Sequence, residues 1–232
     1  MSSFTRRLLY YGIGFGIGLV FVFFFFNNRG CSWLPENRIK DIVSQRIIFI
    51  SEQNMPILNS LGIKENEIEA YIKNAEVFFS KSIKNTNPKV YHFEGPTKTN
   101  ENFVCQIVLY DDSFICELVP NQYSSKNVVP SKKGKGKPVR FPVERNFFYS
   151  DSSRYTICKR KALGIIEDST LMSYFRKSGR IDLLNSDLSG KPKPEHRLTF
   201  KDGEGKEIGF KATFYKEKAK VIFFEYEGED CN

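Results

Sequence analysis

The stretch from Leu8 to Phe26 reads LLYYGIGFGIGLVFVFFFF and contains no charged side chain. A helix needs about 20 predominantly apolar residues to cross the hydrocarbon core of a bilayer. This stretch has that length, and no later stretch of the sequence approaches it. The sequence therefore predicts a tail at residues 1–7, one transmembrane helix at residues 8–26 and a soluble part attached to the lipid bilayer by that helix.

A cleaved signal peptide is the alternative to an uncleaved anchor. A signal peptide has a basic start, a shorter apolar run and small residues before the cleavage point. The run here is long and ends in four phenylalanines, Phe23–Phe26, which favours the anchor. A lipoprotein signal would use Cys31, but Arg29 is a poor residue for such a site.

The orientation of the predicted helix depends on the basic residues beside it. Arg6 and Arg7 precede it, and Arg29, Arg38 and Lys40 follow it, so the count is nearly even. Large domains cross a membrane largely regardless of their charge, whereas a short tail with two arginines is hard to translocate. We therefore predict a single-pass protein of the inner (cytoplasmic) membrane, with its tail in the cytosol and its soluble part in the periplasm.

Four glycines are spaced along the predicted membrane helix. Gly12 with Gly16, and Gly14 with Gly18, form two overlapping pairs separated by three residues. Small residues at this spacing allow helix backbones to approach closely in lipid, which favours a homodimer through this helix. The alternative is that glycine is simply common in membrane helices.

The composition indicates a folded soluble part without a metal site. Hydrophobic residues make up 41% of the chain and aromatic residues 15%, enough for a sizeable core, and the formal net charge is +8. A basic surface suits anionic lipid, envelope polysaccharide or nucleic acid, although scattered lysines are more often a solvated face. With two histidines, five cysteines and no paired C-x-x-C spacing, we predict no metal ligands and no cofactor.

Cys105 and Cys116 lie on two apolar runs that flank Asp111, Asp112 and Ser113. In a hairpin, their equal parity would place both on one face. A disulfide there would suit an oxidising compartment. The alternative, two buried reduced thiols, is the interpretation that we favour.

The soluble part contains an internal duplication. The sequence Leu-Gly-Ile occurs at residues 61–63 and again at residues 163–165. Each copy is followed by an apolar-periodic helix with an acidic first turn, Glu65 or Glu167, and then by three strand-like runs. The predicted fold class is α+β, with one N-terminal transmembrane helix followed by two repeated small units of helices and antiparallel sheet. Beyond the helix, the predicted boundaries are a juxtamembrane segment at 27–46, a first repeat at 47–119, a linker at 120–146, a second repeat at 147–228 and a tail at 229–232.

The predicted linker is rich in proline, glycine, serine and lysine and has no hydrophobic periodicity. This composition is typical of a flexible spacer. Four of its lysines are candidates for contact with phosphate or lipid headgroups, namely Lys132, Lys133, Lys135 and Lys137. The alternative is an ordinary solvated spacer.

The sequence RRLLYYGIGFGIGLVFVFFFF, then Cys31 and the segment Pro35–Lys40, resembles a family of short single-pass proteins from Bacteroidota that carry one domain of unknown function. That domain has a serine-rich strand end, a helix, a Gly-Ile turn, a second helix and a curled three-stranded sheet. The segment from Ile50 to Val119 is similar to it. The resemblance covers residues 6–119 and extends weakly to residues 150–227 through the repeat, and it implies a fold more than a function.

Soluble relatives of that domain are similar to small ribonuclease-type toxins, which have a histidine early in the first helix and an arginine before the Gly-Ile turn. The corresponding positions here are Gln53 and Leu61, and no histidine precedes Gly164 in the second copy. Phosphodiester cleavage needs a group that transfers a proton and a cation that stabilises the developing charge, which glutamine and leucine cannot supply. A catalytic site would have to be rebuilt from other residues, namely His92, Glu94, His196 or Arg197.

Recognisable motifs for hydrolysis, for nucleotide binding and for metal-dependent proteolysis are absent from the sequence. We therefore favour a non-catalytic interaction or scaffold module of the bacterial cell envelope, with an envelope protein as its partner and no catalytic residues. One alternative is a degenerate nuclease-like hydrolase. The other is a basic binder of nucleic acid or anionic lipid, if the soluble part faces the cytosol; a periplasmic location would exclude nucleic acid.

The glycine pairs generate a first prediction. The Gly16→Leu substitution should reduce self-association of the membrane helix in a membrane two-hybrid assay, because a leucine side chain would keep the two backbones apart. An unchanged signal would contradict dimerisation through these glycines.

Overall fold

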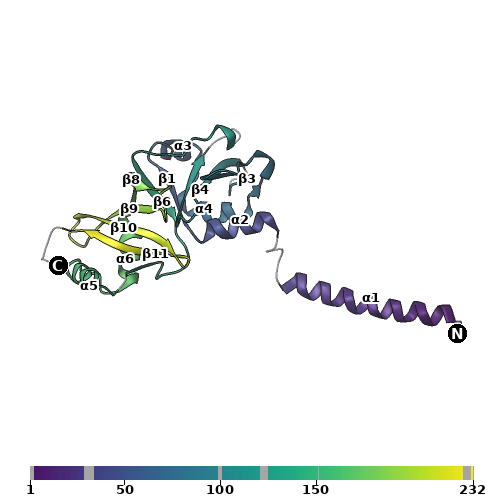
Figure 1. The fold of residues 1–232 in the computed structure, drawn as a ribbon. Coiled ribbons are helices and arrows are strands. Elements are labelled where there is room, and N and C mark those ends of the chain that lie inside the picture. The colour runs from purple at the N-terminus through teal and green to yellow at the C-terminus, as the bar shows by residue number, and fades with distance from the viewer. Residues whose placement is uncertain are drawn as a thin grey trace. The chain divides into compact units, whose positions relative to one another are not determined.

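The structure is a computed structural model that describes residues 3–28, 34–98, 101–120, 125–150, 152–226 and 231. It divides into two compact units, residues 1–39 and residues 40–232, and each is described by itself. Figure 1 shows one long helix in the first unit and a mixture of helices and strands in the second. Cys31 and Arg29, which bear on the lipoprotein alternative, lie outside the described residues.

The long helix of the first unit is α1, Ser3–Asn28. It is long and apolar enough to cross a membrane, and a signal sequence near the N-terminus would have the same character. A Cβ atom added at any of its four glycines would have no atom within 4 Å beyond its chain neighbours and the nearby helix backbone. Dimerisation through these glycines stays a prediction. Helix α2, Pro35–Ser44, follows within the predicted juxtamembrane segment, and its first residue is a proline, as helix starts favour.

The second unit is a mixed α+β structure with a large sheet. In the described residues, eleven strands form one sheet in the order β2-β3-β4-β5-β1-β6-β8-β9-β10-β11-β7. The strands are β1 Ile47–Ser51, β2 Glu76–Val77, β3 Lys89–Pro96, β4 Asn102–Leu109, β5 Ile115–Pro120, β6 Lys135–Arg140, β7 Phe148–Ser150, β8 Arg180–Asp187, β9 Glu195–Lys201, β10 Glu207–Tyr215 and β11 Lys218–Glu225. The helices are α3 Met55–Ser60, α4 Ile68–Asn74, α5 Arg154–Ala162 and α6 Asp168–Ser178, with short 3-10 turns η1 Glu65–Glu67, η2 Phe79–Lys81 and η3 Ser125–Asn127.

The two Leu-Gly-Ile sequences end helices α3 and α5 in the same way. Gly62 has a φ of 67° and Gly164 a φ of 65°, which is the left-handed region that glycine adopts without a steric penalty. The following amides close the helix ends: Ile63 donates to the Leu58 carbonyl at 3.4 Å, and Ile165 donates to the Arg160 carbonyl at 2.8 Å. The glycine amides donate to the carbonyls three residues back, Gly62 to Asn59 and Gly164 to Lys161, both at 3.0 Å. This pair of bonds is a common helix C-cap.

Part of the predicted linker is a strand at the centre of the sheet. Residues 135–140 form β6, which pairs antiparallel with β1 on one side and with β8 on the other. Gly136 is needed for packing, because a Cβ atom there would lie 2.5 Å from the Phe49 ring. Residues 135–140 are therefore not part of a flexible spacer. The composition suggested a spacer because glycine is common in turns, whereas Gly136 allows the backbone to pack closely against Phe49.

Helices α4 and α6 cover opposite faces of the sheet. The Tyr71 ring of α4 lies 4.8 Å from Phe103 of β4, and Phe175 of α6 lies 5.9 Å from Phe210 of β10. The strand pairings place Lys137 of β6 on the same face as Phe103, and Gly136 on the same face as Phe210. Neighbouring residues of a strand point to opposite faces, so the two helices cover opposite faces of the sheet.

The two halves of the sheet, β2-β3-β4-β5-β1 and β8-β9-β10-β11-β7, share one hydrophobic core. Phe114, in the turn between β4 and β5, lies 6.0 Å from Phe147 and 6.2 Å from Phe148 between ring centroids. Phe148 in turn contacts Phe175 at 5.1 Å and Phe210 at 5.4 Å. All five rings are almost fully buried, so residues 40–232 pack as one body and not as two separate domains.

A disulfide joins Cys158 of α5 to Cys231, with their Cα atoms 5.7 Å apart. Cys105 and Cys116 are free thiols, as we expected. Both are fully buried, and desolvation raises the pKa of each to about 12. These two thiols are inert members of the core.

Candidate functional site

The polar side of strands β6, β8, β9, β10 and β11 forms a charged face of the sheet. The strand register aligns Lys135, Asp182, Arg197 and Lys211 in one row across four neighbouring strands. Paired residues share a face, so this row lies opposite the buried row Gly136, Ile181, Leu198 and Phe210. Helix α6 packs on the buried side through Phe175 and Phe210. On the charged face, the side chains of Lys135, Arg197 and Lys211 are partly exposed.

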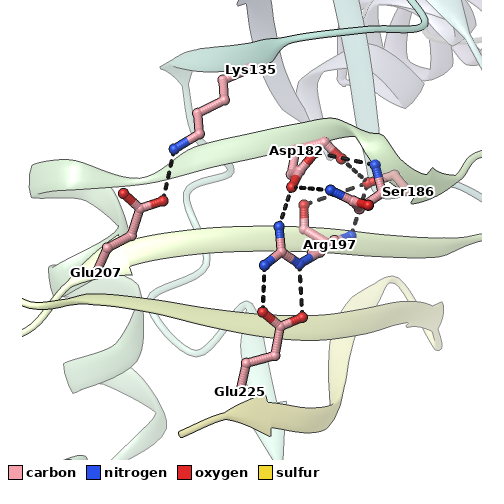
Figure 2. Close-up of polar contacts among 7 residues, drawn as sticks. Lys135, Asp182, Ser186, Arg197, Glu207 and Glu225 are labelled. Atoms are coloured by element: carbon pink, nitrogen blue, oxygen red, sulfur yellow. Dashed lines mark hydrogen bonds and ion pairs between the residues drawn. The ribbon is translucent and has the colours of Figure 1, made fainter.

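Arg197 is the central side chain of the charged face (Figure 2). Its Nε and Nη2 atoms donate to the two carboxylate oxygens of Glu225 at 2.7 and 2.5 Å, and its Nη1 atom donates to Asp182. The bonds to Glu225, and then to Asp182, raise the pKa of Arg197. Burial opposes ionisation of Asp182, but hydrogen bonds from Asn185 and Arg197 outweigh it and lower the Asp182 pKa. Arg197 is therefore committed to two carboxylates and ties β8, β9 and β11 together.

Glycine at position 209 makes this clamp sterically feasible. Gly209 lies on β10, between the strands that carry Arg197 and Glu225. A Cβ atom there would lie 2.2 Å from a carboxylate oxygen of Glu225. The glutamate side chain occupies the space above this glycine to reach the guanidinium.

A groove of about 460 Å³ lies on the charged face where β6, β8 and β9 meet the end of α6. Its lining includes five basic side chains and two carboxylates. The basic residues are Lys135, Lys137, Lys177, Arg180 and Lys201, and the acidic ones are Glu52 and Glu207. The groove therefore carries an excess of positive charge, which favours anionic ligands.

Two of the five cations already have carboxylate partners. Lys135 lies 2.8 Å from Glu207, and this hydrogen bond lowers the Glu207 pKa. Lys137 pairs with Glu65 of η1. Within the described ranges, no carboxylate lies within 4.0 Å of the basic groups of the other three, Lys177, Arg180 and Lys201.

Local structure brings these three cations together. The Lys201 amide donates to the Ser178 hydroxyl at 2.8 Å, which fixes the end of β9 beside the end of α6. Lys177 lies in the last turn of α6, where the helix dipole favours a cation. Arg180 begins β8 directly after that helix, and its Nη1 atom donates to the Gly179 carbonyl at 2.8 Å.

The structure separates the four lysines that the sequence singled out. Lys135 and Lys137 lie on β6 and line the groove. Lys132 and Lys133 are exposed and do not line it. Sequence reasoning missed Lys177, Arg180 and Lys201. The alternation of β8 and β9 marks Arg180 and Lys201 as outward-facing, but no sequence signal places those strands beside β6.

The four residues considered for catalysis do not form one site. His92 lies on β3, where its Nδ1 atom is 3.1 Å from the Gln106 side chain. Glu94, two residues further along β3, lies 3.4 Å from the His92 Nε2 atom and 2.8 Å from the Lys81 Nζ atom. His196 and Arg197 are consecutive on β9 in the other half of the sheet, so they point to opposite faces. In the described part of the chain, no group of three or more His, Cys, Asp or Glu side chains is placed to hold a metal ion.

His196 links the two halves of the core. Its Nδ1 atom lies 3.2 Å from the Ala212 carbonyl, and its Nε2 atom lies 2.8 Å from the Ser113 hydroxyl. A carbonyl only accepts, so Nδ1 carries the proton and Nε2 accepts from the serine. Burial lowers the pKa of His196 to about 4, which keeps the ring neutral at neutral pH.

Comparisons of this chain with protein-family models, with curated proteins and with solved structures find no match. The resemblance described from the sequence stays a prediction. The function is therefore argued from the geometry of the protein itself.

The buried histidine predicts a specific acid sensitivity. The pKa of His196 is lower in the folded state than in the unfolded chain, so its contribution is complete above about pH 6.5 and is lost as the pH falls toward 4. Between pH 7 and pH 5, the free energy of unfolding should fall by about 2 kcal/mol more in the wild type than in His196→Gln. Urea unfolding at both pH values measures this difference, and equal losses in the two proteins would contradict it.

Proposed function

We propose that this chain is a membrane-anchored interaction module of the bacterial cell envelope, and that its charged groove binds an anionic segment of an envelope protein. The observation that carries the proposal is the group of three cations, Lys177, Arg180 and Lys201, around a groove of about 460 Å³ on an open sheet face. Cations without carboxylate partners are available to a ligand. The Arg197 guanidinium is not, because it is paired with Asp182 and Glu225.

Two features support a location on the outer side of the cytoplasmic membrane. Helix α1 has the length and composition of an anchor. The Cys158–Cys231 disulfide suits an oxidising compartment such as the periplasm, because cytosolic thiols are kept reduced. Anchor and disulfide together favour a periplasmic soluble part on a single-pass protein.

The strand order supports the proposal that the soluble part contains two repeated units. One half of the sheet runs β2-β3-β4-β5-β1 and the other runs β8-β9-β10-β11-β7. In each half the first strand in sequence lies parallel beside the last, β1 beside β5 and β7 beside β11. Each first strand leads into a short helix, a Leu-Gly-Ile turn and a second helix. A scaffold built by duplication in this way keeps one fold and varies its surfaces.

The dispersal of the polar residues favours binding over catalysis. A hydrolase needs a proton-transferring group near a stabilising cation. His196 is fully buried and faces away from Arg197, which is saturated by two carboxylates. His196 and Arg197 therefore give the nuclease-like alternative no geometric support.

The location predicts the behaviour of reporters fused after Asn232. A reporter that is active only beyond the cytoplasmic membrane should be active, and one that is active only in the cytosol should be inactive. The reverse pattern would contradict the envelope module and would make nucleic acid or anionic lipid the ligand of the groove.

The groove predicts binding to an anionic polymer. We expect the full-length protein in nanodiscs of neutral lipid to bind heparin, used as a polyanionic probe, and not neutral dextran. Replacing Lys177, Arg180 and Lys201 together by glutamine should weaken heparin binding by about tenfold, because three weak ion pairs are lost. Binding is measured by surface plasmon resonance.

The matched control replaces three exposed lysines outside the groove, Lys126, Lys132 and Lys133, by glutamine. It removes the same charge and should leave binding nearly unchanged. If both triple variants lose binding equally, net charge and not the groove is responsible, and the proposed site is wrong.

A further inference from the structure

Arg140, the last residue of β6, is a buried cation without an anionic partner. Its side chain is only 7% exposed. Its Nη1 atom donates to the Ser44 carbonyl and, at 3.5 Å, to the Arg46 carbonyl. In the part of the chain that the structure describes, its Nε and Nη2 atoms have no hydrogen-bond partner, and no carboxylate lies within 4.0 Å of the guanidinium.

A buried guanidinium without an anionic partner is stabilised when an anion binds its free donors. Buried charges in proteins are as a rule paired, because desolvating an ion is expensive. Burial lowers the Arg140 pKa, and Glu69 only partly offsets this. The Glu69 carboxylate is itself bound by Lys73 at 2.8 Å. The Nε and Nη2 atoms of Arg140 keep some contact with solvent, because neither is a fully buried atom.

These nitrogens belong to a residue that lines an open pocket of about 360 Å³. The pocket lies between the end of α2 and the turn that joins β10 to β11, so both halves of the sheet contribute to it. One part of its lining is apolar and is formed by Pro142, Val143 and Phe147.

The remaining charges of the pocket balance, with three lysines and three glutamates. Of its acidic residues, Glu69 and Glu144 are paired with Lys73 and Lys218, the second pair at 3.2 Å. Lys216 and Glu217 of the turn add one charge of each sign. The buried guanidinium is therefore the charge that a ligand would neutralise.

The wall beside Arg140 is held in place by other contacts. Arg176 donates to the Pro142 carbonyl at 2.9 Å and lies over the Phe141 ring, 4.8 Å from its centroid. The chain from Arg140 to Pro142 is thus fixed from the α6 side. A preformed site of this kind loses little entropy when a ligand enters.

We propose that this pocket binds a small carboxylate with an apolar tail, its carboxylate on Arg140 and its tail against Pro142 and Val143. A planar guanidinium with two free donors matches a carboxylate in a two-point hydrogen bond. The site is separate from the charged groove and does not depend on the function proposed for it.

The test uses the full-length protein in nanodiscs, isovalerate as the probe and isothermal titration calorimetry. Isovalerate should bind with a dissociation constant of about 1 mM or tighter, as expected of a ligand of this size. Isovaleramide has the same tail without the charge, and inorganic phosphate is an anion without the tail. Both should bind at least about tenfold more weakly.

Two valines provide matched variants that leave the core intact. Val143 is 86% exposed at the pocket, and Val129 is 79% exposed elsewhere. Val143→Asp places a negative charge beside the bound carboxylate and should weaken binding by about tenfold, whereas Val129→Asp should change it less than about twofold. Arg140→Gln, where it folds, should abolish binding.

Three results would each overturn the proposal. One is the absence of isovalerate binding. Another is equally tight binding of isovaleramide or phosphate. The third is an equal effect of Val143→Asp and Val129→Asp. Because the groove residues are untouched, heparin binding by the same samples reports separately on the charged groove.

Discussion

Strand β6 is the element on which the rest of residues 40–232 depends. Without it, β1 and β8 would each expose a row of unpaired backbone groups, and such edges promote aggregation. By pairing with both, β6 turns two half-sheets into one and lets the rings around Phe114 pack into a single core. Gly136 makes this insertion feasible, because only a residue without a side chain leaves room for the Phe49 ring.

The same strand also explains where ligands can bind. Helices α4 and α6 cover opposite faces, so the side that α4 covers in one half stays open in the other. Lys135 and Lys137 of β6 point to that open side, beside cations that the end of α6 and the strands β8 and β9 supply. Arg140 ends the strand in a pocket between the two halves. Both proposed sites thus arise at the junction and not within either half alone.

Local signals in the sequence were sufficient for parts of this structure. The charge-free run from Leu8 predicted the long helix. The two Leu-Gly-Ile sequences predicted a repeated order of elements, but not that each of them ends a helix. Strand β6 was missed because its glycine and lysines match the composition of a spacer, while its pairing depends on strands far away in sequence. The Cys158–Cys231 bridge and the cations Lys177 and Lys201 were missed for the same reason: no local pattern specifies a distant neighbour.

The parallel pairing of β1 with β5 has a consequence for biosynthesis. Strand β1, IIFIS, is entirely buried, yet its partners β5 and β6 follow it only after long intervening segments. Contacts so distant in sequence form slowly. A chain that is synthesised from its N-terminus would hold this apolar strand without its second partner, β6, until residue 140 had followed. During that interval the nascent protein exposes an unpaired apolar strand edge, which is prone to aggregation. Its yield therefore depends on how fast β6 pairs with β1 or on a chaperone that covers β1.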